Sequence, residues 1–219
     1  MLKKIIKKIK LINSLSLFKF VYYNYFCKSV KRDKNCWLIP HRNSVIDIDK
    51  SAILNLHANY IMNAHKIKGS KAECILLLRR NATLNVNGRV KLYYNTNVQV
   101  HNEAELNLGD VGMNSGGVLI CAKRITIEDN VSMGRGVYIF DSDHHPIYNA
   151  DGVTINEAKE ILIEENVWLG IKSTVLKGSK IGKGSVVGAH SLIGMEVPEH
   201  VMVGTNMARP ILKEISWHR

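Results

Sequence analysis

Branched aliphatic residues recur at every sixth position through the C-terminal half of the chain, and each is followed four residues later by a small or β-branched residue. The first series is Ile163, Leu169, Val175, Ile181, Val187 and Ile193, and the second is Val167, Ser173, Ser179, Ser185, Ser191 and Val197. The same phase continues upstream through Cys121, Ile125, Ile127, Val131, Met133, Val137 and Ile139. A fixed short period is typical of a solenoid. A large inward side chain followed by a small one at a turn, repeated on three faces, predicts a triangular prism of short parallel strands.

The repeat is interrupted between Ile139 and Ile163, which lie 24 residues apart, a multiple of six. The phase therefore survives the interruption, and residues 141–160 are predicted to leave the prism as a loop. This loop begins with Asp141, Ser142, Asp143, His144, His145 and Pro146.

Short alternating segments precede the regular repeat from about Ser44 onward. Their apolar residues recur every two positions and roughly every six to eight, so we interpret them as earlier, less regular coils of the same solenoid. The segments are 45–48, 52–54, 74–78, 83–88, 98–100 and 106–109.

The pattern divides the chain into three parts. Residues 1–43 are predicted to form a basic N-terminal segment that is helical in part, including the aromatic-rich stretch from Phe18 to Phe26. Residues 44–205 are predicted to form the β-helix, and residues 206–219 a short C-terminal helix that carries Trp217 and caps the open end. The predicted fold class is all-β.

Residues 1–12 place Ile and Leu on one helical stripe and five lysines elsewhere. Two interpretations remain open: a helix that lies on an anionic membrane surface, or a helix packed on the domain by its isoleucine face. Lys19 interrupts the following apolar run and no cleavage site of small residues appears, so we expect no signal peptide. No uncharged apolar run is long enough to predict a transmembrane span.

The net charge of +11 is concentrated at the N-terminus, because residues 1–34 contain ten Lys and Arg and a single acid, Asp33. The rest of the chain is nearly neutral and has no basic stripe with interleaved aromatics, which argues against a nucleic-acid partner. The four cysteines are scattered without a CxxC pair, which indicates a reducing cytoplasm.

The stretch from Ile181 to Ala189, together with Val167-Trp168-Leu169-Gly170, resembles the hexapeptide-repeat acyltransferases, which have a left-handed β-helix. Within that family the chain is most similar to the acetyltransferases that modify sugars, antibiotics or bacterial polysaccharides. The resemblance extends from about Leu106 to the C-terminus. It implies a homotrimer, acetyl-CoA bound between neighbouring prisms without a required metal, and a loop histidine as general base.

The family histidine commonly precedes proline, so the resemblance assigns the base to His145. An imidazole titrates near neutral pH, so it can take a proton from the acceptor and pass it to the departing thiolate. Asp141 or Asp143 is predicted either to fix the tautomer of His145 or to cap the loop turn, and the residues do not decide between the two. Asn114 is expected on the same side of the prism as the histidine, where it would contact the acceptor hydroxyl or belong to a corner ladder of asparagines.

The cofactor site is assigned to Trp168, Gly170, Gly188 and Ala189, with Arg209 and Lys213 for the phosphates of CoA. Trp168 is expected on the outside of a corner, beside the acetyl-CoA cleft or in a trimer contact without ligand. The small residues either leave room for the pantetheine arm or are needed only for tight turns.

These features favour a cytoplasmic O-acetyltransferase that acts on a surface polysaccharide, capsule or lipopolysaccharide at the inner face of the membrane. The alternative is an N-acetyltransferase of an amino sugar nucleotide or an antibiotic. A metal site like that of the γ-carbonic anhydrases would need three well-spaced histidines, which are absent from the sequence pattern. A purely structural scaffold would leave the His-Pro loop without a purpose.

Overall fold

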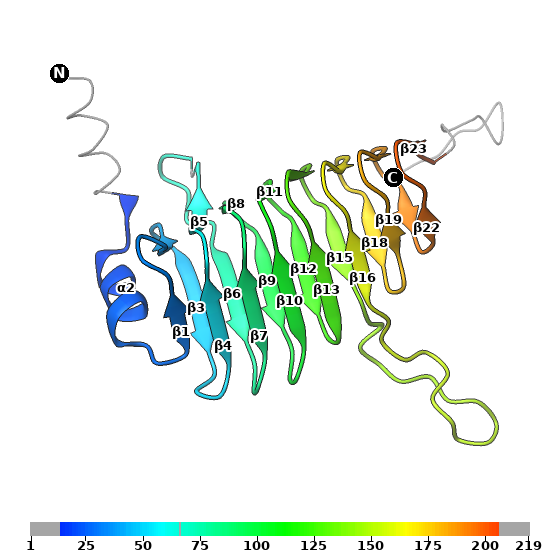
Figure 1. The fold of residues 1–219 in the computed structure, drawn as a ribbon, viewed down its shortest axis with the longest axis horizontal. Coiled ribbons are helices and arrows are strands. Elements are labelled where there is room, and N and C mark those ends of the chain that lie inside the picture. The colour runs from blue at the N-terminus through cyan, green and yellow to red at the C-terminus, as the bar shows by residue number, and fades with distance from the viewer. Residues whose placement is uncertain (1–13, 66, 206–219) are drawn as a thin grey trace, which may run out of the picture.

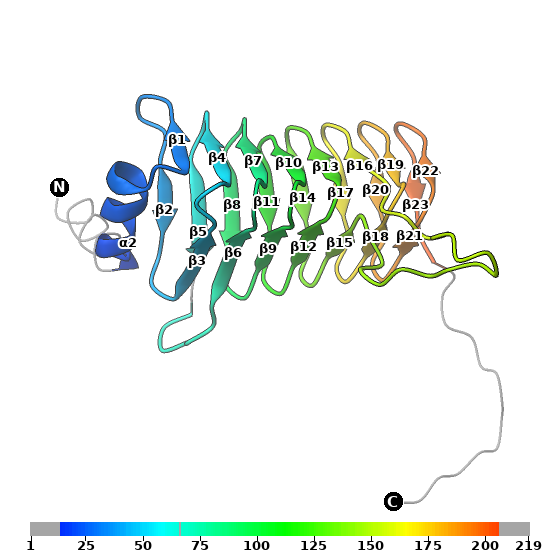
Figure 2. The ribbon, with the colours of Figure 1, turned by 90° about the horizontal axis from the view of Figure 1, so that it is seen from below.

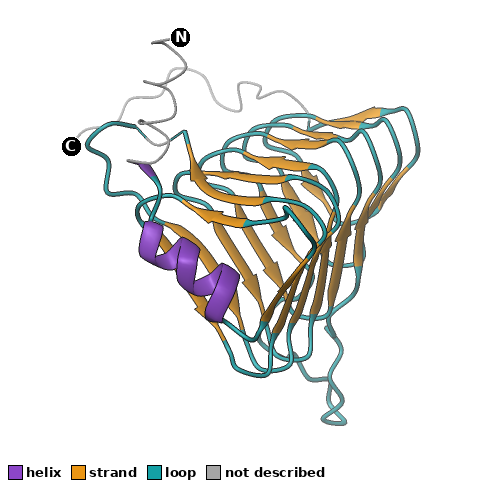
Figure 3. Ribbon diagram, turned by 60° about the vertical axis from the view of Figure 1, so that its left-hand side comes forward, coloured by secondary structure: helices purple, strands orange, loops and turns teal. Residues whose placement is uncertain are grey.

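The computed structural model describes residues 14–65 and 67–205, which form a parallel β-helix of triangular cross-section (Figure 3). Three sheets make the three faces, and each strand pairs in parallel with the strand one coil later. The coils stack along one axis from the N-terminal to the C-terminal end (Figure 1). This arrangement confirms the parallel β-helix predicted from the hexad pattern.

The strands follow the three faces in strict rotation. The first sheet contains β1 (Val30–Arg32), β4 (Ile53–Leu56), β7 (Thr83–Val86), β10 (Glu105–Leu108), β13 (Arg124–Ile127), β16 (Ile161–Ile163), β19 (Lys180–Ile181) and β22 (Glu196–Val197). The second contains β2 (Leu38–Pro40), β5 (Tyr60–Ala64), β8 (Val90–Tyr93), β11 (Val111–Met113), β14 (Val131–Met133), β17 (Trp168–Leu169), β20 (Val186–Val187) and β23 (Met202–Val203). The third contains β3 (Ser44–Ile48), β6 (Cys74–Leu78), β9 (Asn97–Val100), β12 (Val118–Cys121), β15 (Tyr138–Phe140), β18 (Thr174–Leu176) and β21 (Leu192–Ile193).

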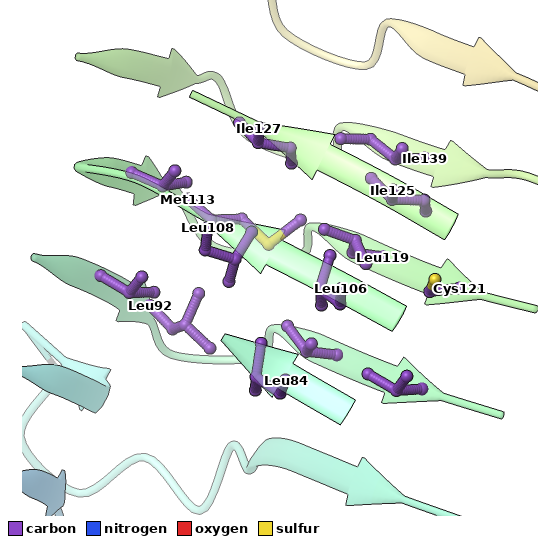
Figure 4. Packing of buried hydrophobic residues seen from close by; sticks show 14 of the residues in the cluster. Leu84, Leu92, Leu106, Leu108, Met113, Leu119, Cys121, Ile125, Ile127 and Ile139 are labelled. Atoms are coloured by element: carbon purple, nitrogen blue, oxygen red, sulfur yellow. The ribbon is translucent and has the colours of Figure 1, made fainter. Parts of the chain in front are cut away.

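Through the C-terminal half of the chain, the interior is filled by the residues of the two six-residue series described above, which we call the hexad series. Leu84, Leu106 and Ile125 stack on one another inside the first sheet (Figure 4), in the register that pairs β7, β10 and β13. The predicted inward serines are also buried, and Ser173, Ser179 and Ser185 each donate a hydrogen bond to a backbone carbonyl. These three hydroxyls therefore have acceptors that make their burial tolerable, whereas the buried hydroxyl of Ser191 has no hydrogen-bond partner among the described residues.

Asparagine supplies many of the corners. Seven asparagines have φ between 54° and 67°, a left-handed conformation that asparagine tolerates better than most residues: Asn35, Asn43, Asn63, Asn81, Asn95, Asn130 and Asn166. We call the turns from the second to the third sheet the second corner, and the turns from the third to the first sheet the third corner.

The β-helix begins earlier than the sequence pattern indicated. β1 pairs with β4, and β2 pairs with β5, so a first coil lies before Ser44, where the domain was expected to start. This coil places Leu38 and Pro40 in the interior. Val30 on β1 also packs against the core, but Val30 and Leu38 do not have the six-residue spacing of the later coils, and for this reason the repeat pattern does not reveal this coil.

A helical segment covers the N-terminal end of the prism (Figures 1 and 2). It consists of α2 (Leu17–Val21) and the π-helical turn η1 (Tyr22–Phe26), which confirms the helix expected over the aromatic-rich stretch. No helix among the described residues has the length and apolar character needed to cross a bilayer. The predicted amphipathic helix at 1–12 and the predicted cap at 206–219 lie outside the described residues.

Candidate active site

Residues 141–160 leave the prism at the third corner, between β15 and β16, and project away from it as predicted (Figure 1). Asp141 lies at the base of this loop and is fully buried. Its carboxylate accepts hydrogen bonds from the backbone N–H groups of Ala122 at 2.6 Å and Lys123 at 2.8 Å. Asp141 therefore caps the turn of the preceding coil and fixes the point at which the loop departs.

Asp143 is held by Lys177 and Asn156. Its Oδ2 lies 2.6 Å from Lys177 Nζ and 2.9 Å from Asn156 Nδ2. The hydrogen bond from Lys177, and then that from Asn156, lower the pKa of Asp143. The sequence left two roles open for these aspartates, fixing the tautomer of His145 or capping the loop turn. In the structure both aspartates make backbone and loop contacts, and neither contacts the His145 ring.

Asn156 organises the loop around His145. Its amide nitrogen donates to the carbonyl of His145 at 2.9 Å as well as to Asp143, and its Oδ1 accepts from the N–H of Ile147 at 2.7 Å. Lys177 Nζ in turn donates to the Asn156 carbonyl at 2.8 Å. The backbone of His145 is thus fixed by a network that begins on the prism.

The two loop histidines lie in different environments. His144 adopts φ 63°, and its ring lies against the prism with its centroid 5.3 Å from that of His101 and 6.3 Å from that of Phe140. Both histidines are exposed and neither ring has a hydrogen-bond partner among the residues the structure describes, but the ring of His145 makes no contact of the kind that His144 makes with His101 and Phe140. An imidazole with both nitrogens unengaged is available to an acceptor substrate.

His101 is a member of this cluster that the sequence analysis missed. Burial lowers its pKa, and the nearby His144 lowers it further, so that the His101 ring is mostly uncharged at neutral pH. Lys177 was also missed, although the repeat register contains a signal for it. β15 pairs with β18 so that Phe140 lies opposite Leu176, which places Lys177 beside the loop base. No periodic signal identifies Asn156, because it lies within the loop.

The other predicted residues gather on a different edge of the prism. Asn114 follows β11 at the second corner, where its side chain accepts a hydrogen bond from the N–H of Ser115 at 2.7 Å. Gly170 and Gly188 follow β17 and β20 at the same corner, one coil apart, and Ala189 is exposed beside them. The structure therefore brings Asn114, Gly170, Gly188 and Ala189 to one edge, and the third sheet separates them from the loop that carries His145.

Gly170 has a structural reason to be glycine. A Cβ at this position would lie 2.7 Å from both the Ala189 nitrogen and the Val187 carbonyl oxygen of the next coil. Close stacking of coils requires glycine here whether or not a ligand binds, so the alternative of a tight-corner residue has direct support.

Trp168 projects from the outer face of the second sheet and is 57% exposed. Its neighbours in register are Ser132 on β14 and Val186 on β20, and Gly112 lies opposite Ser132 on β11. A Cβ added at Gly112 would meet no atom within 4 Å, so the surface next to Trp168 is open. Trp168 and the small residues in register with it therefore lie on an exposed part of the second sheet's outer face. Arg209 and Lys213 lie outside the described residues.

Among the residues the structure describes, no three His, Cys, Asp or Glu side chains form a group able to hold a metal ion.

Residues 160–194 match the family model of the bacterial transferase hexapeptide (six repeats). This match confirms the resemblance to the hexapeptide-repeat acyltransferases. The polysialic acid O-acetyltransferase of Neisseria meningitidis is 32% identical over 131 residues, which cover 58% of this chain and 59% of that protein. The galactoside O-acetyltransferase of Lactococcus lactis is 41% identical over 81 residues, which cover 36% of this chain and 38% of the relative. The chain thus spans about half the length of the curated relatives it matches.

The solved structure of the polysialic acid O-acetyltransferase OatWY superposes with a TM-score of 0.54 at 21% identity, covering 87% of this chain and 90% of that one. At this identity the similarity concerns the fold. The predicted fold class, a left-handed parallel β-helix with an N-terminal helix, is confirmed.

Proposed function

We propose that this protein is a CoA-dependent acetyltransferase that transfers the acetyl group of acetyl-CoA to a hydroxyl group of a carbohydrate. The observation that carries the proposal is the exposed His145, whose ring is unengaged and whose backbone is fixed by Asn156 on a loop of a hexapeptide-repeat β-helix. The names of the relatives, which include enzymes for galactosides and polysialic acid, support a sugar acceptor.

In the proposed reaction, a ring nitrogen of His145 takes the proton of the acceptor hydroxyl as its oxygen attacks the thioester carbon. The tetrahedral intermediate then collapses, the carbon–sulfur bond breaks, and the proton passes from His145 to the CoA thiolate. Asn114 contacts the acceptor hydroxyl. Trp168 lines the path of acetyl-CoA, and Gly170, Gly188 and Ala189 leave space for its pantetheine arm. The cationic side chains of Arg209 and Lys213 are assigned to its phosphates.

The proposal is tested by following thiol release from acetyl-CoA in the presence of a panel of acceptors. The panel contains neutral polysaccharides, polysialic acid, lipopolysaccharide and, for the alternative N-acetylation, amino sugars and amino sugar nucleotides. Product analysis then distinguishes an ester from an amide. Thiol release that no glycan stimulates would reject a carbohydrate acceptor.

We propose in addition that the site forms between copies of the chain in a homotrimer. His145 lies on the third-corner loop, and the residues proposed to bind acetyl-CoA lie on the second sheet and second corner, so a head-to-tail contact between two copies would join the two parts of the site. The outer face of the third sheet supports such a contact, because from β12 to β21 it is largely apolar and includes the exposed Tyr138 and Leu192. Val118, Ile120, Phe140 and Leu176 also face outward on this part of the sheet, together with the polar Thr174.

Complementation between two inactive variants tests the shared site. We expect that the His145→Ala and Ala189→Trp proteins, each inactive alone, regain about a quarter of wild-type activity when refolded together in equal amounts. Each contact of a cyclic trimer joins the loop of one copy to the second corner of the next. In an equal mixture half of the loops and half of the second corners are intact, so about one contact in four combines two intact parts. The comparison is a mixture of the same proteins refolded separately. A mixed sample without activity, or a monomeric wild-type enzyme in sedimentation, would exclude a site between copies.

A further prediction concerns Asn156, which acts on His145 through the backbone. We expect Asn156→Ala to lower kcat about tenfold or more, since small displacements of a catalytic group are costly. The KM for acetyl-CoA should change little, because Asn156 does not lie on the second sheet. Asn149→Ala is the matched control: Asn149 accepts hydrogen bonds from Asp151 and Val153 within the same loop but has no contact with His145. Equal losses of kcat in the two variants would show that the loop needs order in general and not this contact.

The basic N-terminus supports a location at the cytoplasmic face of the membrane, where residues 1–12 would contact anionic lipid.

A further inference from the structure

The helical segment at the N-terminal end of the prism presents an uncovered apolar stripe. Phe18 is 82% exposed and Phe26 is 70% exposed, and the side chains between them on the same face are exposed as well. The stripe consists of Leu17, Phe18, Val21, Tyr22, Tyr25 and Phe26. Aromatic side chains of this size are rarely left in water in such a continuous group.

The opposite face of the segment is firmly attached to the first coil. The buried Asn24 donates to the Leu38 carbonyl at 2.8 Å and accepts from the Leu38 N–H at 2.9 Å. Tyr23 donates to the Ile46 carbonyl at 2.8 Å, and the ring of Phe20 packs on that of Trp37 with centroids 5.6 Å apart. These contacts hold the stripe in a fixed orientation on a segment that lies at the N-terminal end of the β-helix, where Figure 2 shows α2.

The surroundings of the stripe are strongly basic. Residues 14–34 contain Lys19, Lys28, Lys31, Arg32 and Lys34 and one acid, Asp33, which is hydrogen-bonded to His57 at 2.9 Å. Lys28, Lys31 and Lys34 are exposed and have no ion-pair partner among the described residues. An apolar stripe of Phe, Tyr and Leu beside free lysines is the composition of a surface that inserts at a lipid headgroup boundary.

We propose that α2 and η1 form a docking surface for an anionic phospholipid membrane, with Phe18 and Phe26 inserted and the lysines on the lipid phosphates. The charge distribution favours lipid over a second copy of the chain, because an end-to-end dimer would bring two basic rims together. The patch is also small, since ten helical residues provide well below the roughly 20–30 residues per side of a stable protein interface. The inference does not depend on the proposed acetyl transfer and concerns a surface separate from residues 1–12.

Vesicle flotation with the full chain tests the proposal. We expect wild-type protein to bind vesicles of phosphatidylcholine with about 30% phosphatidylglycerol, to bind pure phosphatidylcholine much less, and to lose binding as salt is raised. The double variant Phe18→Ser/Phe26→Ser should partition at least about tenfold less, since two large apolar side chains no longer insert. Ile67→Ser is the control, because Ile67 is 59% exposed on a different turn, after β5.

Lys28→Glu/Lys31→Glu is the second variant, chosen because both side chains are exposed and the fold does not depend on them. It should also weaken binding to anionic vesicles while thermal unfolding is unchanged. Acetyl transfer to a soluble acceptor should be unaffected in both double variants, which separates this surface from the proposed site. Unchanged partitioning of both variants would overturn the proposal. A shift of the Phe18→Ser/Phe26→Ser variant to a smaller assembly would also overturn it, since the stripe would then contact another copy of the chain. New proteolysis within residues 1–13 of that variant would overturn it as well, since the stripe would then contact the chain's own N-terminus.

Discussion

Replacement of His145 by alanine is expected to lower acetyl transfer about 10²–10⁴-fold, the usual contribution of a positioned general base. Affinity for acetyl-CoA should hardly change, because the imidazole acts on the acceptor proton and lies on the loop and not on the second sheet. The residual rate would come from proximity of the two substrates and from hydrogen-bond donors to the oxyanion, which the substitution leaves in place. Steady-state kinetics with the identified acceptor, together with calorimetric titration of acetyl-CoA, measure the two quantities separately.

His144→Ala is the internal control, since the two histidines are adjacent but differently placed. The His144 ring packs near His101 and Phe140, so its loss should disturb the base of the loop. We expect this to reduce the rate less than the loss of His145. If His144→Ala is the more damaging substitution, the base is His144, and the assignment of the histidine before proline is wrong. If neither substitution changes the rate, the proposed mechanism is not the one used.

The six-residue repeat was sufficient to predict the β-helix, because packing of side chains in the interior of the prism is enough to impose this repeat. Every predicted inward residue from Cys121 to Val197 is buried, and the phase is kept across the loop. Such a pattern is local in sequence and repeated many times, so a single irregular corner does not obscure it. The first coil was missed for the opposite reason, because Val30, Leu38 and Pro40 are too few and too irregularly spaced to establish a period.

The candidate site was predictable only in part. The repeat indicates that Trp168 faces outward and that Lys177 lies one coil after the loop base, because register determines both positions. The contacts of Asn156 depend on the path of the loop, which no periodicity describes. The sequence also placed Asn114 near the histidine, whereas within one chain the third sheet separates the second corner from the loop. In the proposed homotrimer these residues would meet only across the contact between copies, and the six-residue repeat describes packing within one chain alone.

Replacement of Asp141 by alanine is expected to have the largest effect on stability. The carboxylate is fully buried and accepts the N–H groups of Ala122 and Lys123, and both would lose their partner. Loss of two hydrogen bonds between part-buried amides and a buried carboxylate should lower the free energy of unfolding by about 2–4 kcal/mol, and the midpoint of thermal unfolding by roughly 5–15 °C. Because the loop departs from this residue, kcat should fall as well, even at temperatures where the variant remains folded.

The Asp151→Ala variant is the control for charge and loop position, since Asp151 lies exposed within the same loop and its side chain has no hydrogen-bond partner among the described residues. We expect it to leave both the unfolding midpoint and kcat unchanged. Asp141→Asn should lie between the two, because its amide oxygen keeps one of the two N–H groups while its NH₂ group faces the other. If the midpoint of thermal unfolding of Asp141→Ala equals that of the wild type, the turn at Ala122 and Lys123 is held without the carboxylate. In that case the loop base depends on Lys177 and Asp143, and their removal should produce the loss of stability that Asp141 did not.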